Sequence, residues 1–75
     1  MISVKVCWRH NGKPAENRKV VLSFDGMFGG QSKHEYTNSS GEAHFDNNPG
    51  PGKVYVDGKT VYTGRLEGMM VVYIS

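Results

Sequence analysis

Residues 54–62 read VYVDGKTVY, two short runs rich in Val and Tyr that are joined by Asp57 and Gly58. An Asp-Gly pair suits a type I′ turn, because both of its residues accept the positive φ angles that this turn requires. The stretch therefore predicts a β-hairpin.

The clearest single strand lies near the start of the sequence. Ile2, Val4, Val6 and Trp8 alternate with Ser, Lys and Cys, which is the period of two that a half-buried strand shows. Because Trp8 continues the apolar face of this strand, we expect its side chain to be buried between two sheets.

Further strand-like runs are separated by turn signals. Residues 47–52 contain two prolines and are predicted to be a loop, because each proline would remove a donor from a sheet ladder. The other expected strands are residues 19–25, 31–37 (a polar edge strand), 42–46 and 69–74. About seven short strands, with no amphipathic helix, predict an all-β protein built as a small antiparallel sandwich or barrel. Seventy-five residues suffice for one core, so residues 1–75 are expected to form a single domain.

Three segments carry a resemblance to a known group of domains. Residues 11–15 (NGKPA) precede the strand that begins near Val20, residues 37–45 read TNSSGEAHF, and residues 48–56 read NPGPGKVYV. In this order they resemble carboxypeptidase-regulatory-like domains and their transthyretin-like relatives. The resemblance implies a Greek-key, prealbumin-like (Ig-like) β-sandwich.

Domains of this group are mostly binding, spacing or accessory modules, which makes a non-enzymatic role the expectation. One branch, the hydroxyisourate hydrolases, is enzymatic and carries a Thr-His-Val-Leu-Asp opening and a Tyr-Arg-Gly-Ser end. Here residues 7–10 read CWRH and residues 72–75 read VYIS, so that activity is not carried over. A small transthyretin-like hydrolase, using the three histidines or Ser75, remains the alternative.

Composition limits which cellular compartment and which classes of partner are expected. Cys7 is the only cysteine, so no internal disulfide can form, and no signal peptide or apolar run of ~20 residues is visible. We therefore expect a cytoplasmic protein. A net charge of +2 is too small to imply a nucleic-acid or membrane partner, although basic residues gather around the first turn, from Arg9 to Lys19.

No catalytic or metal site is predicted. Cys7 and His10 have Cys-x-x-His spacing, and His34 and His44 are further possible ligands, but the paired motifs of a structural zinc site are missing. Carboxylate pairs that Asp46 would form with Glu35 or Glu42 look like a solvated strand face, since polar residues alternate there. We assign no catalytic residue, metal or cofactor.

Exposed aromatic residues point to binding instead. If Val54 and Val56 point inward, Tyr55 points outward, and an inward Val61 leaves Tyr62 outward on the facing strand. Two surfaces are therefore candidates for a protein partner: a Tyr-rich sheet face (Tyr36, Tyr55, Tyr62) and the glycine-rich loop 26–30 around Met27 and Phe28. Carbohydrate binding by the same tyrosines, or tyrosine pairs that merely cover the sheet, are the alternatives.

Residues 69–74, MMVVYI, differ from the other expected strands. The run from Met69 to Ile74 has no charge and no alternation, so it is apolar on both faces, whereas a sandwich strand has a core on one side only. A second copy of the chain would cover the other face. We therefore expect a homodimer with this strand at or near the interface.

Overall fold

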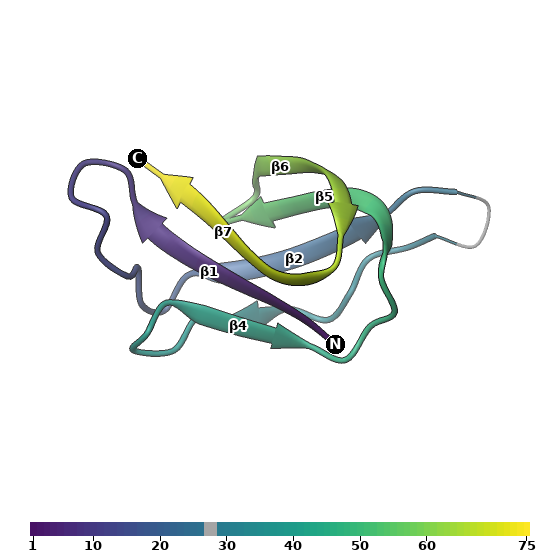
Figure 1. Cartoon of the computed structure of the whole chain (residues 1–75), viewed down its shortest axis with the longest axis horizontal. Coiled ribbons are helices and arrows are strands. Elements are labelled where there is room, and N and C mark those ends of the chain that lie inside the picture. The colour runs from purple at the N-terminus through teal and green to yellow at the C-terminus, as the bar shows by residue number, and fades with distance from the viewer. Residues whose placement is uncertain (27–28) are drawn as a thin grey trace.

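The computed structural model describes residues 1–26 and 29–75, and these form seven strands and no helix (Figure 1). The strands are β1 (Ile2–Trp8), β2 (Lys19–Phe24), β3 (Glu35–Tyr36), β4 (Glu42–Phe45), β5 (Gly50–Val56), β6 (Lys59–Leu66) and β7 (Gly68–Ile74). The all-β class predicted from the sequence is confirmed.

The strands form one three-stranded sheet, in the order β4-β1-β7, and one four-stranded sheet, in the order β3-β2-β5-β6. The predicted hairpin is confirmed as β5 and β6, with Asp57 (φ 51°) and Gly58 (φ 84°) both in the left-handed region. Two sheets of this size are compatible with a small β-sandwich.

One strand pair departs from the expected antiparallel arrangement. β7 runs parallel to β1, from Ile2 opposite Gly68 to Trp8 opposite Ile74. The cause is the connection: Glu67 alone separates β6 from β7, and Gly68 (φ 58°) turns the chain into the other sheet beside the start of β1. Both strands then run the same way, so their arrowheads end together, next to the C-terminus (Figure 1).

The core lies between the two sheets and is aliphatic except for Phe45. Alternate residues of β1, from Ile2 to Val6, are fully buried, as the period of two predicts. Residues of the other strands and one loop alanine complete the cluster: Ala15, Val20, Leu22, Ala43, Phe45, Val54, Val56, Leu66 and Val72.

The prediction that residues 47–52 form a loop is wrong for its second half, because β5 begins at Gly50. Pro51 is tolerated there for a geometric reason. Its carbonyl oxygen accepts a hydrogen bond from the Asp25 amide (2.9 Å). In a strand, the N–H and C=O groups of one residue point toward the same neighbouring strand, which for Pro51 is β2. That neighbour, β2, ends at Phe24, so the missing N–H falls just beyond the ladder.

The predicted burial of Trp8 is only partly confirmed, because its side chain is partly buried and not enclosed. It packs against the core, but it lies at the last position of β1, where β6 and β7 belong to different sheets and leave the end of the molecule open. The Arg18 guanidinium carbon lies 5.4 Å from the centre of the Trp8 ring, and the His10 ring is 6.1 Å away.

Candidate binding site

The open end of the two sheets forms a cleft of about 360 Å³. It lies where β1 and β7 end and where the β5–β6 hairpin turns. We call it the β6–β7 cleft. Its lining residues are Trp8, Arg9, Arg18, Val56, Asp57, Lys59, Thr60, Val61, Tyr73, Ile74 and Ser75.

The floor of the β6–β7 cleft is apolar. Val56 belongs to the buried core, and Trp8, Val61 and Ile74 are partly buried side chains packed against it. These residues come from both sheets, so the cleft opens directly onto the inner faces of the sandwich. An apolar surface of this kind can contact an apolar group of a small molecule.

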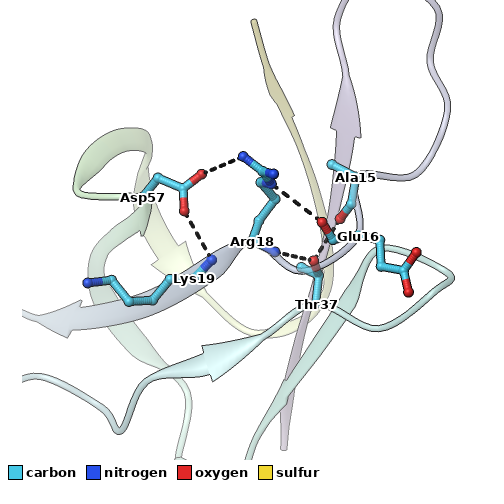
Figure 2. Close-up of polar contacts among 6 residues, drawn as sticks. All are labelled: Ala15, Glu16, Arg18, Lys19, Thr37 and Asp57. Atoms are coloured by element: carbon cyan, nitrogen blue, oxygen red, sulfur yellow. Dashed lines mark hydrogen bonds and ion pairs between the residues drawn. The ribbon is translucent and has the colours of Figure 1, made fainter.

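Charged side chains surround this floor. Arg9, Arg18 and Lys59 are cationic, and Asp57 is the one carboxylate side chain among the lining residues that the structure describes. Asp57 is already engaged, since its Oδ1 accepts a hydrogen bond from the Lys19 amide (3.2 Å) and its Oδ2 lies 3.4 Å from Arg18 Nη1 (Figure 2). The lining side chains therefore carry more positive than negative charge.

Arg18 is positioned by the backbone around it. Its amide donates to Thr37 Oγ1 (2.8 Å), and the Thr37 hydroxyl in turn donates to the Ala15 carbonyl (2.7 Å) (Figure 2). Thr37 is buried, so this hydroxyl is the internal partner of two backbone groups that water does not reach easily. Arg18 Nε also donates to the Glu16 carbonyl, at 3.4 Å.

We expect Thr37→Val to lower the free energy of unfolding by about 1–3 kcal/mol, because the Ala15 carbonyl and the Arg18 amide lose their shared partner while the side-chain volume is kept. Urea unfolding followed by circular dichroism measures the change. Thr63→Val, at an exposed position of β6, is the matched control and should be close to neutral. Equal stability of the two variants would contradict the role assigned to the Thr37 hydroxyl.

Tyr55 and Tyr62 are not paired directly across the β5–β6 ladder. A register shift in the β5–β6 ladder places Tyr55 opposite Thr60 but Tyr62 opposite the buried Val54. Tyr62 is therefore not the cross-strand partner of Tyr55, but it is exposed (37%), as predicted, and the role of the tyrosines in binding stays a prediction. Tyr62 instead donates a hydrogen bond to the carbonyl of Arg65, within its own strand (3.2 Å).

Tyr36 is exposed on β3, at the far edge of the same sheet, opposite Lys19. The inward position predicted for Val61 is confirmed by its contact with the core. Met27 and Phe28, the candidates in the glycine-rich loop, lie outside the described residues.

Among the residues that the structure describes, His44 makes the one contact that resembles a catalytic pair. Ser3 Oγ lies 2.8 Å from His44 Nδ1, and His44 Nε2 lies 3.6 Å from Glu42 Oε1. Ser3 and His44 are cross-strand partners in the β1–β4 ladder, which accounts for the short distance. At 3.6 Å the carboxylate is beyond hydrogen-bond distance of the ring and does not fix its orientation, as a catalytic triad requires.

A second cleft, of about 490 Å³, lies beside β3 and β4. It brings Glu35, His44 and Asp46 to one concave surface, together with Lys33. Within residues 1–26 and 29–75, however, no three His, Cys, Asp or Glu side chains are placed to hold a metal ion. Cys7 is buried.

No protein-family profile matches the chain, and no curated protein or solved structure is significantly similar to it. In the part of the chain that the structure describes, there is no helix of the length and apolarity that crossing a membrane requires.

Proposed function

We propose that the protein is a non-enzymatic interaction module that self-associates, with β7 of one copy pairing with β7 of a second copy. The observation that carries this proposal is the exposure of three apolar side chains on an edge strand. Met69, Val71 and Tyr73 are 55%, 49% and 49% exposed. Within the described residues β7 pairs with β1 alone, so one of its edges is free.

The free edge lacks the features that keep edge strands apart. Natural edge strands carry Lys, Pro or a bulge, or are very short, because their unpaired amides and carbonyls otherwise attract another strand. β7 spans seven residues, contains no charged residue and no proline, and pairs with β1 without a shift in register. This makes the edge open to strand addition.

A second copy suits this edge because an uncharged strand meets its own copy without charge repulsion. Antiparallel pairing about a two-fold axis at Val71 places Met69 of each copy opposite Tyr73 of the other. Contacts between a thioether and an aromatic ring are favourable. Ser3 and Lys5, the β1 neighbours of Met69 and Val71, give the apolar patch a polar border, as protein interfaces have.

The expected family relationship supports a binding role over a catalytic one. β4 lies beside β1, which is how the fourth strand of a Greek key returns to the first. Together with the three sequence segments that resemble carboxypeptidase-regulatory-like and transthyretin-like domains, this supports a Greek-key, prealbumin-like sandwich. Most domains of that kind bind partners and have no catalysis of their own.

The test is the oligomeric state of a Val71→Glu variant. The new carboxylate would lie opposite Lys5 in the β1–β7 ladder, so the fold is not penalised, but across the two-fold axis it would face its own copy. We expect the dissociation constant of the dimer, measured by sedimentation velocity, to rise about tenfold or more, equivalent to ~1.4 kcal/mol.

Tyr36→Glu is the matched control, because it places the same charge on the exposed edge strand of the other sheet, opposite Lys19. It should leave the dimer unchanged. A native chain that stays monomeric across the micromolar range would overturn the proposal, and so would a dimer that Val71→Glu leaves intact.

A further inference from the structure

We infer that the β6–β7 cleft binds a small organic carboxylate with an apolar or aromatic body. This inference goes beyond self-association through β7 and does not depend on it. Its basis is the combination, in one cleft, of an apolar floor and a surplus of cationic side chains.

The cationic groups select an anion. Three cations and one carboxylate line the cleft, a surplus of two positive charges (3 − 1) among side chains of the described residues. Arg18 is the central donor. Its contacts with Asp57 and with the Glu16 carbonyl are both long, at 3.4 Å, so they hold the guanidinium over Trp8 without using its five N–H groups fully. A planar guanidinium can bind a carboxylate in a bidentate manner, through two parallel hydrogen bonds.

The apolar floor of the cleft favours a ligand whose remaining part is apolar. Trp8, Val56, Val61 and Ile74 offer an apolar surface to which inorganic phosphate could make no favourable contact. A volume of about 360 Å³ lies at the lower end of the range for small-molecule sites. It accommodates one ring with a short acidic chain. A nucleic-acid strand is a poorer match, because it needs several stacking platforms along a groove.

A carboxylate on an apolar body has two sources, a free organic acid or the C-terminal residue of a peptide. Both present the same chemistry to Arg18 and to the floor. The probes therefore include 3-phenylpropionate for the first source and N-acetyl-alanyl-phenylalanine for the second. The neutral amide 3-phenylpropionamide and inorganic phosphate serve as the two comparison ligands.

Trp8 fluorescence can report ligand binding, because Trp8 lines the cleft and is the only tryptophan of the chain. Titration of 3-phenylpropionate should change the Trp8 emission saturably, with a dissociation constant on the order of 1 mM for a ligand of this size. The backbone amide signals of Val56 and Ile74 should shift over the same concentration range. The peptide should bind more tightly than 3-phenylpropionate if the source is a protein C-terminus, and less tightly if it is a free acid.

Arg18→Gln should weaken binding of 3-phenylpropionate about tenfold or more, because it removes the charged donor. Lys13→Gln, which removes an exposed cation outside the cleft, should leave binding within a factor of about two. The amide spectra of both variants verify that each is folded. Three results would overturn the inference: no saturable response to either acid, equal binding of the amide or phosphate, or unchanged binding by folded Arg18→Gln.

Discussion

Gly52→Ala is expected to remove most of the free energy of unfolding of the protein. Gly52 is buried in β5, which is hydrogen-bonded to β2 on one side and to β6 on the other. A Cβ atom at this position would overlap the carbonyl oxygen of Ser23 in β2 and would lie 3.1 Å from Leu66 Cδ1. Leu66 Cδ1 is the end of a side chain and can shift, but the Ser23 carbonyl is a backbone group that cannot move away without disrupting the β2–β5 ladder. We expect a loss of about 3 kcal/mol or more, against a total stability of ~5 kcal/mol for a chain of this length.

Gly30→Ala is the matched control. A Cβ atom there meets nothing within 4 Å, and the residue is exposed. This variant should unfold at the same urea concentration as the native chain, whereas Gly52→Ala should show no cooperative transition, or one shifted far toward zero urea. Coincident transitions of the two variants would show that β2 and β5 are not as close at Gly52 as the structure places them.

Some strands of this fold were predictable from the sequence and others were not. The hairpin at Asp57 and Gly58 and the alternating strand from Ile2 were predictable, because each depends on residues adjacent in the chain. The strand that includes Pro51 was not. A proline is excluded from a ladder only where a neighbour needs its N–H, and the end of β2 at Phe24 is a property of strand pairing.

The candidate site was harder to predict for the same reason. Basic residues between Arg9 and Lys19 were visible in the sequence as a cluster, but Asp57 and Lys59 were visible only as parts of a turn. The fold brings these two groups of residues together across the open end of the sandwich. The pairing of the tyrosines was not predictable either, since the register shift near Val61 places Tyr62 opposite Val54 and not opposite Tyr55.

In the edge strand β7, successive residues face opposite sides of the sheet, as they do in any strand. Val72 is 3% exposed and is paired with the buried Val6, while the adjacent Val71 is on the outer surface. Both are valines in one strand, so composition and propensity cannot distinguish them. A charge placed at one or the other therefore tests the inward face and the outward face separately.

We expect Val72→Glu to unfold the protein, because a carboxylate among aliphatic side chains has no cation or hydrogen-bond donor to pair with. The cost of such an unpaired buried charge is about 3–5 kcal/mol, most of the stability of a 75-residue chain. Circular dichroism and the dispersion of amide signals measure the loss.

Val71→Glu separates this effect from loss of the dimer, since it carries the same charge at the interface and should remain a folded monomer. If Val72→Glu unfolds and Val71→Glu does not, the instability comes from the core and not from dissociation. Folded proteins at both positions would place Val72 outside the core, and unfolding of both would mean that the chain has no stable monomer.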